Sequence, residues 1–140
     1  MLATPLTMAL MAQTVANGGV QRTPSVVRGD EAAGSRRVIS GRTARTLRRF
    51  MVGVVRNGTG TAAAIPGVVV AGKTGTAELG STQGPTGEDQ GAADTDAWFT
   101  SFAPARKPRI VVAVMLVKAG AWGQTAAPAA RIVLQAGLQR

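Results

Sequence analysis

The residues with the clearest chemical potential form one short run in the middle of the chain. In the order Lys73, Thr74, Gly75, Thr76, a single amine is followed by two hydroxyls that flank a glycine. Lysine is rare here, since the chain holds only three lysines. A strand with this composition offers a cation, hydroxyls and accessible backbone amides along one edge. These groups suit a bound carboxylate and a substrate amide that adds to the sheet as a further strand.

Two motifs fit this run, and the first is the phosphate-binding loop. Residues 67–74 (GVVVAGKT) satisfy the pattern G-x-x-x-x-G-K-[ST]. The neighbouring residues argue against it, because Pro66 precedes the first glycine and proline cannot pair within a central strand. Val68, Val69 and Val70 favour a strand over a loop, and Gly75 makes a poor helix start. Nucleotide binding is therefore an alternative that the local sequence disfavours.

The second motif is Lys-Thr-Gly, one of the signatures of penicillin-binding proteins and class A β-lactamases. The match extends beyond three residues, because residues 71–78 (AGKTGTAE) resemble the longer form found in the transpeptidase domain of penicillin-binding proteins. Further segments resemble that domain in the same order: residues 4–9 (TPLTMA), 16–19 (ANGG), 54–60 (VVRNGTG) and 96–104 (DAWFTSFAP). The chain, residues 1–140, is thus identified as the C-terminal part of such a domain.

The resemblance implies a chemistry and a role for each residue of the motif. In this family a serine attacks a peptidoglycan stem peptide that ends in D-Ala-D-Ala and then passes the acyl group to an amine. β-Lactams mimic this acyl donor. By position, Lys73 would supply positive charge beside the catalytic groups. The hydroxyls of Thr74 and Thr76 would bind the substrate carboxylate, and Gly75 would let the substrate backbone approach. The Thr76 N–H would be one of two oxyanion donors.

The attacking half of the family's site has no counterpart in the sequence. A Ser-x-x-Lys motif needs serine three residues before lysine, where this chain has Val70, Pro104 and Met115, and no Ser-x-Asn occurs. Without histidine, a Ser-His-Asp site is excluded as well. We therefore expect the N-terminal half of the domain to be a partner, the isolated chain to be inactive, and the incomplete sheet to expose an edge and apolar surface.

The amino-acid composition limits which other functions and cofactors the chain could have. A hydrophobic content of 45% with 16% charged residues indicates a globular chain. With no Cys and no His, we expect no disulfide, metal or other cofactor. The net charge of +9 leaves a non-catalytic basic module for anionic polymer or nucleic acid as the alternative function. For the transpeptidase domain itself we expect no nucleic-acid partner, since few aromatic residues are present for base stacking.

The first 16 residues are apolar but do not predict a membrane segment. They are too short for a span, polar residues interrupt them, and they lack the basic start of a signal peptide. We expect membrane contact only through segments upstream of this sequence. By family resemblance, the parent protein is expected to be anchored in the cytoplasmic membrane with this domain outside it.

Local patterns predict the elements that position the motif. Thr4 and Pro5 start a helix that ends at residues 17–19. A second, basic helix at 43–57 carries an apolar stripe, and a third helix covers 125–138. Strands are expected from Val68 through the motif, at 97–103 and at 109–118, the last covered on both faces. Residues 20–39 predict a small hairpin or two short extended pieces around a turn at 29–35, and residues 80–95 a long loop. The class is α+β: three antiparallel strands with packed helices, an incomplete domain.

Overall fold

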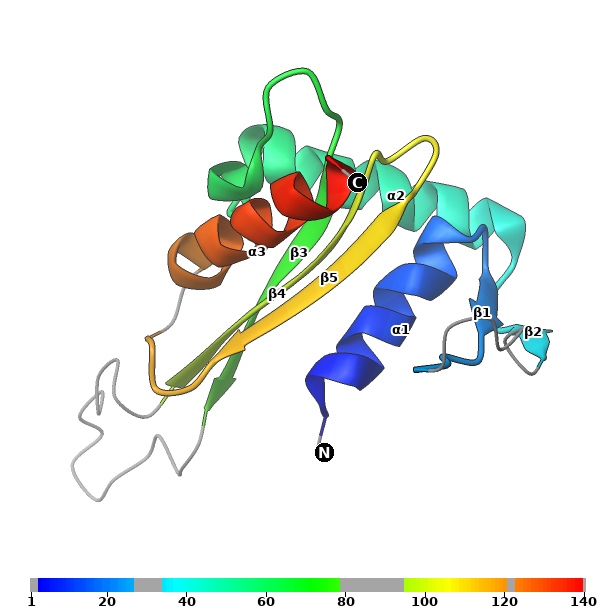
Figure 1. Ribbon diagram of the computed structural model, residues 1–140, viewed down its shortest axis with the longest axis horizontal. Coiled ribbons are helices and arrows are strands. Elements are labelled where there is room, and N and C mark those ends of the chain that lie inside the picture. The colour runs from blue at the N-terminus through cyan, green and yellow to red at the C-terminus, as the bar shows by residue number, and fades with distance from the viewer. Residues whose placement is uncertain (1–2, 27–33, 79–94, 121–122, 140) are drawn as a thin grey trace.

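The computed structural model describes residues 3–26, 34–78, 95–120 and 123–139. Its centre is a three-stranded antiparallel sheet with helices on both faces (Figure 1). The strands are β3 (Ala71–Glu78), β4 (Thr95–Ala103) and β5 (Ile110–Leu116), in the spatial order β3-β4-β5. This arrangement confirms the predicted α+β class with three antiparallel strands.

Two of the three helices begin at a capping side chain. Helix α1 spans Pro5–Ala16, and the Thr4 side chain caps it by accepting a hydrogen bond from the backbone N–H of Thr7. Helix α2 spans Gly41–Asn57 and is capped in the same way by Ser40, which accepts from the Thr43 N–H. Helix α3 spans Gly123–Leu138. The capping hydroxyls satisfy backbone donors that the first helical turn leaves free.

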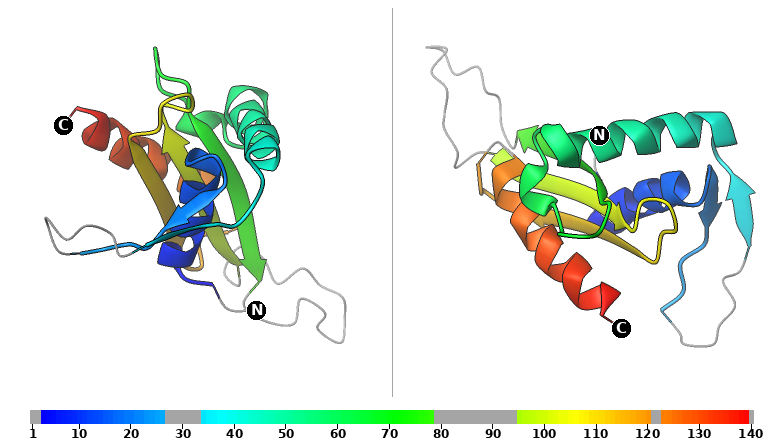
Figure 2. Two further views of the ribbon diagram at one scale, coloured as in Figure 1. Left: turned by 90° about the vertical axis from the view of Figure 1, so that its right-hand side faces the viewer. Right: turned by 90° about the horizontal axis from the view of Figure 1, so that it is seen from above.

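Each face of the sheet has its own helical cover (Figure 2). On one face α3 packs on β4 and β5 and buries Phe99, Val112 and Leu134, among others. On the other face α1 and α2 enclose a smaller cluster that contains Val15, Met51 and Phe102. Strand β4 separates these two clusters and is the most deeply buried strand, because its side chains point alternately to both of them.

An arginine ties the two helices of the second face together. The Nη2 atom of Arg48, on α2, donates to the carbonyl oxygen of Ala16 at 3.0 Å, at the C-terminal end of α1. Carbonyls at a helix C-terminus lack intrahelical partners and carry partial negative charge, so a guanidinium there is favourable. A second hydrogen bond fixes α1 to the sheet, since the hydroxyl of Thr100 on β4 donates to the Met8 carbonyl of α1 at 3.2 Å.

Strand β3 begins later than predicted. The valines at 68–70 precede the strand, which starts at Ala71. The cause is a tight turn: the Val68 N–H donates to the Ile65 carbonyl at 3.1 Å, and Gly67 has a φ of 74°. Proline at the second position and glycine with positive φ at the third are typical of a type II turn. A short 3₁₀ helix, η1 (Thr61–Ala63), comes before this turn.

Strand β5 differs from the prediction that both of its faces are covered. Within the described residues it is an edge strand paired only with β4, and Val112 is its one buried residue. The small hairpin is confirmed as an antiparallel pair, β1 (Val20–Arg22) with β2 (Ser35–Arg37). Most of its turn and almost all of the predicted 80–95 loop fall outside the described residues. None of the described helices is both long and apolar enough to cross a membrane.

Candidate functional site

All four residues of the predicted site lie in the middle of β3. In the antiparallel register with β4, Lys73 is opposite Thr100, Thr74 opposite Phe99, and Thr76 opposite Ala97. Because side chains alternate along a strand, Lys73 and Gly75 share the α1/α2 face, whereas Thr74 and Thr76 share the α3 face. No described strand pairs with the outer edge of β3, so this edge is open.

The Lys73 amine curls around that open edge. Its Nζ donates to the backbone carbonyl of Thr74 at 2.7 Å and lies 3.5 Å from the Thr74 hydroxyl oxygen. The Thr74 carbonyl therefore faces the open edge rather than β4. Backbone groups of residues two apart in a strand point the same way, so the N–H and C=O of Thr76 face the open edge too.

A threonine outside the motif completes this cluster. The Thr59 hydroxyl lies 2.8 Å from the Thr74 hydroxyl, and either atom is able to donate. Thr59 follows Gly58, which ends α2, and so belongs to the loop between α2 and β3. Sequence reasoning gave residues 54–60 no role beyond resemblance. No local signal pointed to Thr59, because η1 and a turn separate it from the motif strand.

Three glycines allow the loop and β3 to pack closely against side chains of β4. The Phe99 ring is fully buried, and a Cβ added at Gly72 would collide with it. A Cβ at Gly60 would lie 3.0 Å from the same ring, and one at Gly75 would lie 3.2 Å from the Cβ of Trp98. The missing side chains allow β3 and the loop to lie directly against β4.

An apolar groove of about 430 Å³ opens beside Lys73, between α1 and α2. Several of its lining side chains are exposed although they are large and apolar: Met11 by 56%, Leu47 by 37% and Phe50 by 61%. The predicted apolar stripe of α2 is thus only partly buried, at Ala44, Met51 and Val55. Lys73 and Thr100 contribute the polar part of the lining.

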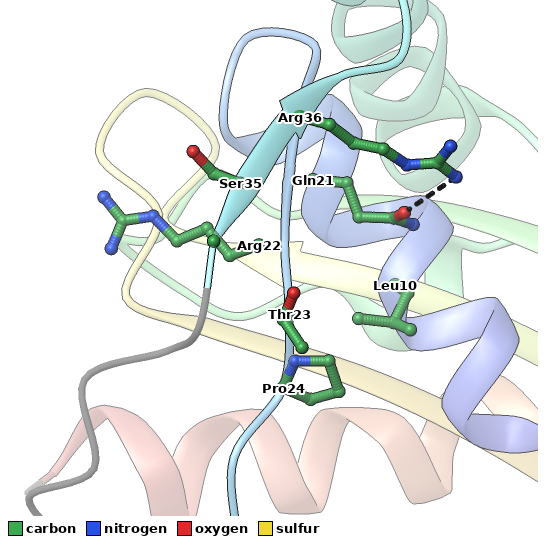
Figure 3. Close-up of a pocket in the computed structure, with 8 residues that line it drawn as sticks. Leu10, Gln21, Arg22, Thr23, Pro24, Ser35 and Arg36 are labelled. Carbon is green, nitrogen blue, oxygen red and sulfur yellow. Dashed lines mark hydrogen bonds between the residues drawn. The ribbon is translucent and has the colours of Figure 1, made fainter.

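A second cavity, of about 380 Å³, lies between α1 and the small β1/β2 sheet (Figure 3). Two arginines line it, but Figure 3 shows that their guanidinium groups point apart. Arg36 turns toward Gln21 and donates to its Oε1 at 3.5 Å, whereas Arg22 extends away on the other side. The two charges do not converge on a single anion, so this cavity gives no support to a basic binding module.

The phosphate-loop alternative is wrong. Lys73 and Thr74 lie inside a strand that continues to Glu78, whereas a phosphate-binding loop places its lysine where a helix begins. The described residues also contain no group of three His, Cys, Asp or Glu side chains that could hold a metal ion.

Comparison with known proteins agrees with the motif. The family described as the penicillin binding protein transpeptidase domain matches residues 1–135. The peptidoglycan D,D-transpeptidase PbpA of Mycobacterium tuberculosis is 39% identical over 153 residues, which cover 97% of this chain and 29% of that protein. The penicillin-binding protein PbpB of Mycolicibacterium smegmatis is 36% identical over 150 residues, covering 89% and 22%. The chain therefore spans less than a third of these relatives.

Solved structures of the same family resemble this chain as well. The penicillin G acyl-enzyme complex of penicillin-binding protein A from M. tuberculosis superimposes with a TM-score of 0.77 at 35% identity, covering 98% of this chain and 32% of that one. The transpeptidase domain of penicillin-binding protein 3 from Burkholderia pseudomallei gives a TM-score of 0.81 at 29% identity, covering 98% and 42%. With its Lys-Thr-Gly strand at an open sheet edge, the chain belongs to the penicillin-binding protein transpeptidase domain family.

Proposed function

We propose that this chain is the C-terminal part of a peptidoglycan D,D-transpeptidase domain and forms one wall of its acyl-transfer site. The observation that carries the proposal is the open edge of β3, where the Lys73 amine, the Thr74 hydroxyl and the backbone of Thr76 lie together. A stem peptide or a β-lactam would bind along this edge as an additional antiparallel strand.

In this role the hydroxyls of Thr74 and Thr76 bind the substrate carboxylate, and Lys73 adds a positive charge near it. Hydrogen bonds to a charged group are about twice as strong as those between neutral groups. Gly75 leaves room for the substrate backbone. The Thr76 N–H faces the same edge and donates to the oxyanion that forms when the donor is attacked. Loss of one such donor costs other enzymes roughly 3–4 kcal/mol of transition-state stabilisation.

The nucleophilic serine and the general base come from the N-terminal half of the domain. Two features support this division: the sequence has no Ser-x-x-Lys, and the chain spans only 29% of PbpA. The apolar groove beside Lys73 is where that half would pack, because covering it buries Met11, Leu47 and Phe50 and brings new side chains next to the amine. The complete domain would act outside the cytoplasmic membrane, where peptidoglycan is cross-linked.

Covalent labelling with a fluorescent penicillin tests this proposal. The isolated chain should give no stable labelled band on a denaturing gel, whereas the protein that joins it to a serine-bearing N-terminal half should be labelled. In that protein, Lys73→Ala should slow labelling by about 100-fold, the size of effect seen when one charge-stabilising group is removed from an acyl-transfer site.

Lys107→Ala is the matched control, because Lys107 is an exposed lysine in the turn between β4 and β5. It should leave the labelling rate unchanged. A covalent band on the isolated chain would refute the division of the site between two segments. Equal losses from both lysine substitutions would refute the role given to Lys73.

A further inference from the structure

The loop between α2 and β3 reaches the candidate site through one side chain. The hydroxyl of Thr59 lies 2.8 Å from that of Thr74, although the two residues are 15 apart in the sequence. Thr59 is exposed and Thr74 is half-buried, so the contact lies at the surface where a substrate would arrive. Thr59 lies outside the Lys-Thr-Gly motif, and the proposed function gives it no role, so its contact with Thr74 is a separate observation.

Counting donors and acceptors shows what each direction of the Thr59–Thr74 hydrogen bond would leave free on Thr74. A threonine hydroxyl has one hydrogen to donate and two lone pairs that accept. The Lys73 ammonium is only able to donate, and it lies 3.5 Å from the Thr74 hydroxyl oxygen. If Thr59 donates to the same oxygen, both lone pairs are used. The Thr74 hydrogen is then left to point away from protein groups, toward an incoming acceptor.

The loop that carries Thr59 is held firmly. The backbone N–H groups of Gly58 and Gly60 both donate to the Val54 carbonyl at 3.1 Å, which fixes the loop to the last turn of α2. On the other side, Gly60 packs against the Phe99 ring, and Phe99 is paired directly with Thr74 across the sheet. Thr59 and Thr74 are thus positioned by the same buried side chain, so their separation is set by packing.

We propose that Thr59 is a positioning residue for carboxylate recognition. It orients the Thr74 hydroxyl as a donor, and the chain Thr59→Thr74→carboxylate strengthens each of its bonds by polarisation. The inference rests on the proposed function, since it assumes that Thr74 binds the carboxylate of a stem peptide or a β-lactam. It predicts that Thr59 matters only for ligands that carry this negative charge.

The test compares two β-lactams that differ in this one group, benzylpenicillin and its methyl ester, on the serine-containing protein. Acylation rates would be measured by intact mass spectrometry. Thr59→Val keeps the shape and removes the hydroxyl. It should slow acylation by benzylpenicillin about tenfold, because the Thr74 hydroxyl is then no longer held as a donor to the charged carboxylate, while the rate with the ester stays nearly unchanged. Thr59→Ser should restore the rate with benzylpenicillin.

Thr61→Val is the control, because Thr61 is an exposed threonine two residues further along the same connection. It should leave both rates as they are. Equal losses with both β-lactams after Thr59→Val, or no loss with either, would overturn the inference while leaving the proposed function intact. Failure of benzylpenicillin to acylate the unsubstituted protein would instead overturn the proposed function, and this inference with it.

Discussion

Phe99 is the side chain around which the candidate site is packed. It is fully buried, lies opposite Thr74 in the strand pairing, and touches the positions where Gly60 and Gly72 would carry a Cβ. Close-packed interiors leave no space for an additional carbon without displacing a neighbour. The glycines before the motif therefore have a steric role, which is to let the strand and the preceding loop meet the ring.

Gly72→Ala should lower the free energy of unfolding by about 1–3 kcal/mol, because the new methyl group collides with the Phe99 ring and forces a shift in the core. Urea unfolding followed by tryptophan fluorescence would measure the loss. Gly53→Ala is the control, since nothing lies within 4 Å of a Cβ at Gly53. There alanine should raise stability slightly, by up to about 1 kcal/mol, through its helix propensity. Equal effects at both glycines would contradict the steric explanation.

The residues of the candidate site could be predicted only as far as they are contiguous. Lys73, Thr74, Gly75 and Thr76 were recognisable because a short motif holds all of them, and the structure gathers them on one strand. The contact between Thr59 and Thr74 could not be predicted, because it depends on how α2 packs on β3. A hydrogen bond made by tertiary packing leaves no local pattern.

At the level of elements, the sequence predicted best what local chemistry decides. The helix start at Thr4 was predicted because the capping side chain lies within four residues of the N–H that it binds. Helix α2 begins at Gly41, two residues before the predicted start at Thr43, because Ser40 caps it. The start of β3 was misjudged because the valine run suggested a strand, whereas the Pro66-Gly67 turn holds the chain away from the sheet until Ala71. The position of β5 at an edge was also missed, because an apolar run does not reveal how many neighbours a strand has.

The cap of α2 offers a test at this scale. Ser40→Ala removes the hydroxyl that accepts from the Thr43 N–H at 3.0 Å, and it should cost about 1 kcal/mol of unfolding free energy. Ser40→Asp is the matched variant. Its carboxylate accepts the same hydrogen bond and favours the positive end of the helix dipole, so stability should stay near that of the unsubstituted chain. A similar loss in both variants, measured by urea unfolding, would show that capping is not the reason Ser40 matters.

In the part of the chain that the structure describes, one face of the sheet is closed by a helix and the other is open. Helix α3 seals its side of the sheet with buried alanines and Leu134. On the other side α1 and α2 leave the apolar groove uncovered, with Lys73 in its lining. Large exposed apolar patches mark surfaces that bind another chain or promote association. Under the proposed function, the open face is the side from which a complementary segment would complete both the core and the candidate site.

This asymmetry gives a prediction for the molecule as a whole. Replacing Leu47 and Phe50 with glutamine should reduce binding of a hydrophobic dye by the isolated chain and suppress its self-association in sedimentation experiments. The same two substitutions should weaken association with a separately expressed serine-bearing half by about 100-fold, as expected when about 3 kcal/mol of apolar burial is lost.

The control is Ile132→Gln with Val133→Gln, which removes two exposed apolar side chains from α3, on the opposite face. If the α3 pair weakens association as much as the groove pair, the groove is not the surface that receives the other half. If only the Leu47 and Phe50 substitutions weaken association, the other half binds at α1 and α2. Penicillin labelling of the mixed halves should then fall in the same order as their association.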